Sequence, residues 1–247
     1  MVSRTSQSQT TKSPGGPPEP CGVVNLYKPR GWTSAKYVYR LRPIFGLRKI
    51  GHAGTLDPFA DGVIVACVGG ATRWVERIMA MPKRYRTTLR LGVTNETFDP
   101  EQPFREVPGA QPPPRAAIDA AVSAMRGDVM QTPPDYSAMR VGGRFSYQRV
   151  KAGETVRHEP RVIRIDAIDV LAYAWPRLEL DIACGRGTYI RAIARDLGVT
   201  LGCGAICESL TRTAVGPFEI KGSVDLTRSD PQAVRAALVT SLDASDG

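Results

Sequence analysis

The chain has 247 residues, of which 42% are hydrophobic, and this is enough to bury a sizeable core in one large domain or two small ones. Lysine and arginine number 33 against 24 acidic residues, which gives a formal charge of +9 and a pI near 9.6. This excess favours a polyanionic partner, nucleic acid before membrane, and the alternative is a basic surface that only keeps the protein soluble. No apolar run approaches the roughly 18 residues of a transmembrane helix, which excludes a helical membrane protein.

Residues 1–20 are rich in Ser, Thr, Pro and Gly and predict a disordered tail ahead of an ordered region over residues 21–247. They lack the apolar stretch of a signal peptide. We therefore expect a cytoplasmic protein in which the five cysteines are reduced thiols.

The first ordered segment, GVVNLYKP, predicts a strand that Pro29 closes. Thr33 or Ser34 can cap a following helix, which Pro43 must bend or end. A glycine-punctuated loop, GHAGTLDPFADG, comes next. The apolar run VIVACVG after it predicts a buried strand.

The rest of the chain alternates between strand and helix patterns. The segment KRYRTTLRLGV predicts a half-exposed strand, and residues 99–115, with their six prolines, predict a surface loop. The segment AAIDAAVSAMRG then predicts an amphipathic helix, and QTPPDYSAM predicts an extended loop. Two strands, RVIRIDAIDVLAY and RLELDIACG, precede a helix over TYIRAIARDLGVTLG that ends at Gly198 or Gly202, and a last helix is expected over 231–241. Strands outnumber helices in mixed order, which predicts an α+β fold with a central mixed, mainly antiparallel sheet.

One loop places a single carboxylate, Asp57, directly before Pro58. The proline forces Asp57 out of the helical region, and the glycines nearby allow a ligand to approach closely. The alternative is a local Asx-turn closed by Asp57. A phosphate-binding loop is a poor match because the GxxxxGK[ST] pattern is absent.

Asp57 and Asp61 stand four residues apart, which suggests a paired-carboxylate site or a metal site. The chain has only two histidines, and Cys203 and Cys207 lack a second cysteine pair. We therefore expect no metal.

Two further segments combine cations with aromatic rings. Lys83-Arg84-Tyr85-Arg86 is one, and the stretch from Tyr136 to Arg149 is the other. Cations can contact phosphates while rings stack on exposed bases, as looped RNA requires. The alternative is that the rings are core and the arginines a solvated face.

The segment CGRGTYIR places two glycines before a helix start that Thr188 can cap. Arg191, the last residue of this segment, is a candidate partner for a buried carboxylate, since a guanidinium group favours a bidentate pair. An ordinary surface arginine is the alternative.

Together these segments resemble the pseudouridine synthases of the bacterial TruB type, which make pseudouridine-55 in the T-loop of tRNA. The resemblance covers about residues 21 to 225 and rests on NLYKPRGWTS, GHAGTLDPFADGVIVACVGGATR, KRYRTTLRLG, QTPPDYSAMRVGGRFSY, CGRGTYIRAIARDLG and LGCGAICESLTR. It implies the pseudouridine synthase fold over residues 21–247. It also implies an enzyme that needs no cofactor and acts on the T-arm of tRNA. Nothing in the sequence suggests an obligate assembly or a membrane partner, so we expect a monomer that works away from membranes.

The resemblance also implies the site residues. Asp57 corresponds to the catalytic carboxylate, Arg191 to the arginine that pairs with it, and Tyr189 to a tyrosine that we expect to help remove the C5 proton. Three others correspond to residues that bind the flipped nucleotide: Tyr85 stacks on the uracil, Leu210 forms an apolar wall, and His52 contacts the extruded nucleotides. Lys28-Pro29 matches a motif regarded as mainly structural.

Two departures from the family pattern are visible. Asn95-Glu96-Thr97 stands where Thr-Asp-Thr is common, and no C-terminal RNA-binding domain of the PUA type is expected. Three other functions remain open: a synthase that depends on a guide RNA, a non-catalytic RNA-binding or chaperone protein, and a glycosidase that uses Asp57 and Asp61.

Overall fold

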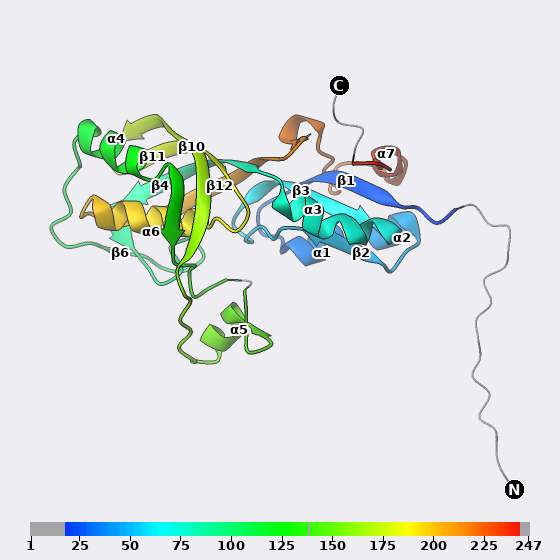
Figure 1. The fold of residues 1–247 in the computed structure, drawn as a ribbon, viewed down its shortest axis with the longest axis horizontal. Coiled ribbons are helices and arrows are strands. Elements are labelled where there is room, and N and C mark those ends of the chain that lie inside the picture. Colours follow the sequence, from blue (N-terminus) through cyan, green and yellow to red (C-terminus); the bar gives the residue numbers. More distant parts are fainter. Residues whose placement is uncertain (1–17, 138, 243–247) are drawn as a thin grey trace, which may run out of the picture.

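A long mixed sheet runs through the computed structural model, which describes residues 18–137 and 139–242 (Figure 1). Its strands are β1 (Gly22–Lys28), β2 (Ile50–Ala53), β3 (Asp61–Val68), β4 (Lys83–Leu91), β7 (Gly127–Gln131), β10 (Arg161–Ala174), β11 (Arg177–Cys184), β12 (Ala205–Val215) and β13 (Phe218–Glu219). Two short ladders lie outside it, β5 (Val93–Thr94) with β6 (Arg105–Glu106) and β8 (Arg140–Val141) with β9 (Arg144–Phe145). The helices are α1 (Ser34–Val38), α2 (Leu41–Phe45), α3 (Val75–Ala80), α4 (Arg115–Ala124), α5 (Ser146–Lys151), α6 (Ile190–Thr200) and α7 (Pro231–Ala236), with 3-10 turns η1 (Gly69–Trp74) and η2 (Ile220–Gly222).

The sheet order is β1-β3-β12-β4-β11-β10-β7, with β2 paired to β3 and β13 to β12. Within the described residues every strand pair is antiparallel except β12 with β3, which are parallel over Thr211–Arg212 and Asp61–Gly62. This short parallel contact joins two antiparallel halves. The predicted α+β class with a mixed, mainly antiparallel sheet is therefore confirmed.

Each half of the sheet is covered by its own helices (Figure 1). In the half built on β1 and β3, Tyr37, Val38 and Leu41 of α1 and α2 pack on one face with Val234 of α7, and Ile78 of α3 packs in a separate cluster with Val63 and Val65. β3 is buried along its whole length, as its apolar sequence predicts. In the other half, α6 and α4 cover one face of β12, β4, β11 and β10.

Several expected elements are correct, but their ends differ. The helix expected from Thr33 onward is two short helices, because α1 ends at Val38 and Pro43 lies in the first turn of α2, where its missing N–H is not needed. Thr33 caps α1 as expected, since its hydroxyl accepts a hydrogen bond from the Lys36 backbone N–H at 3.3 Å. The last helix ends at Ala236 instead of 241.

Two strands of five residues or more, β7 and β12, were not expected from the sequence. The long strand β12 lies at the centre of the sheet between β3 and β4. Gly198 does not end α6 but lies inside it, because its missing side chain allows the backbone of Gly204 and Ala205 to approach.

Between β7 and β10 the chain leaves the sheet, and residues 132–137 and 139–160, which we call the 132–160 excursion, carry the β8–β9 ladder and α5 away from the body of the molecule (Figure 1). The predicted tail falls outside the described residues up to residue 17. The proposal that residues 21–247 form a catalytic domain without a PUA-type domain stays a prediction. Among the described residues, no helix has both the length and the apolar sequence to span a bilayer.

Candidate active site

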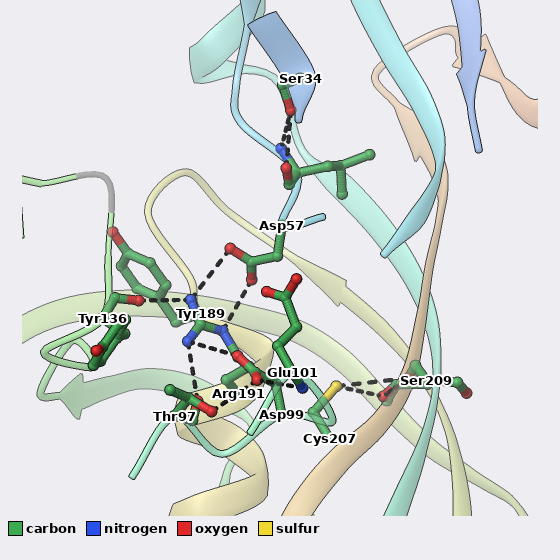
Figure 2. A network of polar contacts seen from close by, with 12 residues as sticks. Ser34, Asp57, Thr97, Asp99, Glu101, Tyr136, Tyr189, Arg191, Cys207 and Ser209 are labelled. Carbon is green, nitrogen blue, oxygen red and sulfur yellow. Dashed lines mark hydrogen bonds and ion pairs between the residues drawn. The ribbon is translucent and has the colours of Figure 1, made fainter. Parts of the chain in front are cut away.

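Asp57 and Arg191 form a bidentate ion pair across the two halves of the molecule (Figure 2). Arg191 donates from Nε to Oδ2 of Asp57 at 2.9 Å and from Nη2 to Oδ1 at 3.2 Å. Asp57 lies in the loop between β2 and β3, and Arg191 lies in the first turn of α6. The expected pairing is confirmed. Among the described residues the Asp57 carboxylate accepts from Arg191 and from no nearby backbone N–H, so the Asx-turn interpretation is wrong.

The Arg191 guanidinium is enclosed by further oxygen acceptors. It donates to the carbonyls of Thr97 at 3.0 Å and Tyr136 at 2.8 Å, and Nη1 lies 3.2 Å from Oδ2 of Asp99. The side chains of Arg191 and Asp99 are each 4% exposed, whereas that of Asp57 is 32% exposed. Asp57 is therefore the member of this network that a substrate can reach.

Burial and charge oppose each other in this network. Burial alone would lower the pKa of Arg191, but the charges of Asp57 and Asp99 outweigh it and raise that pKa above its ordinary value. Burial raises the pKa of Asp99, although the Arg191 charge acts in the opposite direction. Arg191 thus stays a cation beside Asp57.

A buried lysine holds the loop that carries Asp57. The Lys28 side chain is fully buried, and burial lowers its pKa to about 8. Its Nζ lies within hydrogen-bond distance of four backbone carbonyls, those of Ala60 at 2.7 Å, Trp32 at 2.8 Å, Pro29 at 3.0 Å and Pro58 at 3.5 Å. On the other side of the loop, the Ser34 hydroxyl accepts from the Leu56 N–H at 2.8 Å and donates to the Leu56 carbonyl at 2.9 Å. These contacts link the N-terminal strand and α1 to the residue that precedes Asp57.

Asp61 does not form a carboxylate pair with Asp57. Its Oδ2 accepts from Arg30 Nε at 2.9 Å, and its Oδ1 accepts from the Thr211 hydroxyl at 2.5 Å. Asp61, the first residue of β3, thus bonds to the segment after β1 and to β12 where the two halves meet, so the glycosidase interpretation with two acting carboxylates is wrong. Cys203 and Cys207 are buried free thiols, and the described residues contain no group of three His, Cys, Asp or Glu side chains arranged for a metal.

Tyr85 and Leu210 lie beside the ion pair in one apolar cluster. Tyr85 is 8% exposed on β4 and Leu210 5% exposed on β12, and Leu56 belongs to the same cluster. Burial raises the pKa of Tyr85, so its hydroxyl stays protonated. The structure thus places an aromatic ring and an aliphatic side chain in the same cluster as Leu56, the residue before Asp57.

His52 lies on β2, opposite Ala66 of β3. Burial lowers the pKa of His52, and the nearby charge of Arg212 lowers it further, so the ring is neutral. Its Nδ1 is buried without a hydrogen-bond partner among the described residues. A buried, unsatisfied ring nitrogen is costly unless something else pairs with it.

Tyr189 is the N-cap residue of α6 and is half-buried. The Arg161 guanidinium lies 5.5 Å from the centre of the Tyr189 ring. Thr188 does not cap the helix as expected, because its hydroxyl donates to the Gly185 carbonyl at 3.2 Å. The backbone N–H of Tyr189 donates instead to Gln131.

Nothing in the sequence singles out Asp99, Arg212 or Gln131. Asp99 lies just beyond Asn95-Glu96-Thr97, the segment that departs from the family pattern. Arg212 is fully buried and donates from Nε to the Val63 carbonyl at 2.7 Å and from Nη2 to the Gly54 carbonyl at 3.1 Å. A buried cation or carboxylate can be recognised only when its partners are known, and these partners are distant in the chain.

An accessible carboxylate paired with an enclosed arginine, near an aromatic and an aliphatic side chain, can act as a nucleophile or base on a substrate bound beside them. Residues 42–190 match the N-terminal domain model of the TruB family pseudouridylate synthases. The chain belongs to this family. The resemblance inferred from the sequence motifs is confirmed, and with it the class of enzyme, a pseudouridine synthase.

Curated relatives cover most of the chain. It is 46% identical over 229 residues to the tRNA pseudouridine synthase B of Mycobacterium tuberculosis (strain ATCC 25618 / H37Rv), covering 90% of this chain and 75% of the relative. It is 40% identical over 206 residues to the enzyme of the same name from Stutzerimonas stutzeri (strain A1501), covering 83% and 67%.

A solved structure, described as a Cbf5-Nop10-Gar1 complex, contains a chain with the same fold. Its TM-score to this chain is 0.64 at 28% identity, over 83% of this chain. This chain spans only 52% of that longer chain.

Proposed function

We propose that this chain converts uridine to pseudouridine at position 55 in the T-loop of tRNA, with Asp57 as the catalytic carboxylate. The observation that carries the proposal is the Asp57–Arg191 pair, in which the arginine is enclosed and the carboxylate remains one-third exposed. Relatives at 40–46% identity carry the name tRNA pseudouridine synthase B, which supports tRNA as the substrate.

The chemistry requires the target uridine to leave its stack, because its C1′ cannot be reached inside a folded loop. The extruded uracil would stack on Tyr85 and contact Leu210, while His52 contacts the flipped nucleotides. These three side chains lie on β4, β12 and β2, three strands that flank the Asp57 loop or its ion pair.

A carboxylate offers two routes for breaking the C1′–N1 bond. Asp57 either adds to C1′ while N1 leaves with the bonding electrons, or removes the 2′ proton as N1 leaves. In both routes the detached uracil rotates until C5 faces C1′. In the first route C5 then bonds to C1′ and displaces the Asp57 carboxylate, and in the second Asp57 returns the proton to C2′ as C5 bonds to C1′. The C5 proton then leaves while N1 gains a proton, which restores the conjugated ring, and Tyr189 is the candidate to accept or relay the C5 proton. The overall reaction is an isomerisation, so its atoms and electrons balance without a cofactor.

A basic surface close to the site supports an RNA stem as the partner. Residues 21–56 contain seven lysines and arginines and no acid. Five of these, which we call the α1–α2 basic surface, are exposed and form no ion pair among the described residues: Lys36, Arg40, Arg42, Arg48 and Lys49. The surface begins two residues after Ser34, which is hydrogen-bonded to Leu56, so phosphates beside a flipped uridine lie within reach.

We expect such an enzyme to act as a monomer in the cytoplasm.

The test is tritium release from a tRNA transcript labelled at C5 of uridine. Wild type is expected to release one tritium for each target uridine, whereas Asp57→Asn releases none and still binds the transcript. Asp119→Asn is the matched control, because Asp119 is exposed on α4 and pairs only with the adjacent-turn Arg115 among the described residues.

Each outcome separates the remaining functions. Turnover by pure Asp57→Asn would contradict the proposed role of this residue. Release that occurs only with an added guide RNA would indicate a guide-dependent synthase. RNA refolding by wild type and Asp57→Asn alike, without release from either, would indicate a chaperone.

A further inference from the structure

Tyr189 is held by a side chain from a distant part of the chain. Gln131, the last residue of β7, accepts a hydrogen bond from the Tyr189 N–H at 2.8 Å through Oε1 and donates to the Tyr189 carbonyl at 3.2 Å through Nε2. Gln131 is 3% exposed. One amide thus bonds both main-chain groups of one residue, as a neighbouring strand would.

The position of Tyr189 makes this contact important. Tyr189 is extended, with φ −105° and ψ 115°, and the helix begins at the next residue. The Tyr189 side chain makes no capping hydrogen bond to the first turn of α6. The change of backbone direction at Tyr189 sets where its ring points relative to Arg191, two residues later, and Gln131 supplies the acceptor that the Tyr189 N–H needs.

The residue paired with Gln131 on the neighbouring strand also contacts the segment that leads into α6. Gln131 is paired with Arg161 in the β7–β10 register. Arg161 donates to the Gly187 carbonyl at 2.5 Å, and its guanidinium lies 5.5 Å from the centre of the Tyr189 ring. Two adjacent ladder residues therefore fix the backbone on both sides of Thr188.

We propose that Gln131 is a positioning residue, which keeps Tyr189 and the first turn of α6, with Arg191, aligned to Asp57. This inference rests on the proposed function. The position requires an amide, because an amide donates and accepts at once, whereas an ionised carboxylate only accepts and a thioether is a poor substitute for either.

The first experiment compares turnover with binding. Gln131→Met removes both hydrogen bonds at nearly constant size. Its single-turnover rate at saturating tRNA should fall roughly 10- to 100-fold, since a 1 Å displacement of reacting groups can cost about that much, while the Kd for tRNA stays within about threefold. Gln232→Met, on the exposed face of α7, is the matched control and should keep the wild-type rate.

The second experiment measures hydrogen exchange of the Tyr189 amide without substrate. Gln131→Met should accelerate it at least about tenfold, whereas Gln131→Glu, which retains an acceptor, should leave it close to wild type. If Gln131→Met fails to fold, Gln131→Glu tests the proposal instead. This variant lacks the N–H donor to the Tyr189 carbonyl, so its turnover rate should be lower than that of wild type.

These measurements separate the two proposals. Wild type that releases no tritium contradicts the proposed function, and the exchange rates still test the Gln131 contact. Unchanged exchange at Tyr189 in Gln131→Met, or a turnover within about twofold of wild type, overturns the positioning role.

Discussion

Arg191 is the residue on which the site depends most directly. Its guanidinium contacts Asp57, Asp99 and two backbone carbonyls, and it lies almost entirely out of solvent. The planar guanidinium, with five N–H donors in a fixed geometry, suits this arrangement, whereas a lysine ammonium would reach fewer of these oxygens. Because Asp99 is equally buried, the loss of Arg191 would leave a buried carboxylate without its counter-charge.

Arg191→Met is therefore expected to lower both stability and activity. Breaking a buried ion pair from one side costs about 3–5 kcal/mol in the free energy of unfolding. The double variant Arg191→Met/Asp99→Asn should regain much of this stability in urea unfolding, because no buried charge remains unpaired. Tritium release should stay at least about 100-fold below wild type in both variants. Normal turnover by a folded Arg191→Met protein would contradict the role of the pair.

At the scale of single elements, α6 places the site residues at its start and depends on close packing at its end. Gly198 lies in the last turns of α6, where a Cβ would overlap the backbone of Ala205 and approach the Gly204 carbonyl carbon at 2.5 Å. β12, which carries Leu210, can therefore begin directly against the helix. The sequence suggested that the helix ends at Gly198 or Gly202. The structure ends α6 at Thr200, just before the left-handed Gly202, and the contact with the next strand explains Gly198.

Gly198→Ala tests this packing. Helix propensity alone would stabilise the variant by about 1 kcal/mol. The overlap with backbone atoms cannot be relieved by a side-chain rotation, so we expect a net loss of about 1–3 kcal/mol in urea unfolding. Val199→Ala, at a position 74% exposed on the same helix, should be neutral or slightly stabilising. A stabilised Gly198→Ala protein would show that α6 and β12 can separate without cost.

Across the whole molecule, the site lies where two antiparallel halves of one sheet meet. Asp57 comes from one half and Arg191 from the other, so the ion pair forms only when both halves are folded. The α1–α2 basic surface lies in the half that carries Asp57, whereas the 132–160 excursion extends from the other half (Figure 1).

The α1–α2 basic surface predicts a salt-dependent affinity. The triple variant Lys36→Glu/Arg40→Glu/Arg48→Glu should bind tRNA more weakly. The slope of log K against log salt should fall by about one for each phosphate that the protein no longer neutralises. The single-turnover rate at saturating tRNA should stay near wild type, because none of these residues belongs to the Asp57 network. Arg115→Glu on α4 is the control, and an unchanged slope in the triple variant would exclude this surface from RNA binding.

Short local patterns were enough to predict the α+β class and most of the strands, since β3 and β4 follow from an apolar run and a strict alternation. The pairing of Asp57 with Arg191 was implied by the family resemblance, because the local patterns alone left an Asx-turn and a surface arginine open. The roles of Tyr85, Tyr189, Leu210 and His52 remain predictions that the geometry supports. Asp99, Gln131, the anchoring by Lys28 and the buried state of Arg212 were decided only by tertiary structure. Each depends on a partner far along the chain, and a hydrogen bond or desolvated charge exists only after folding brings the two together.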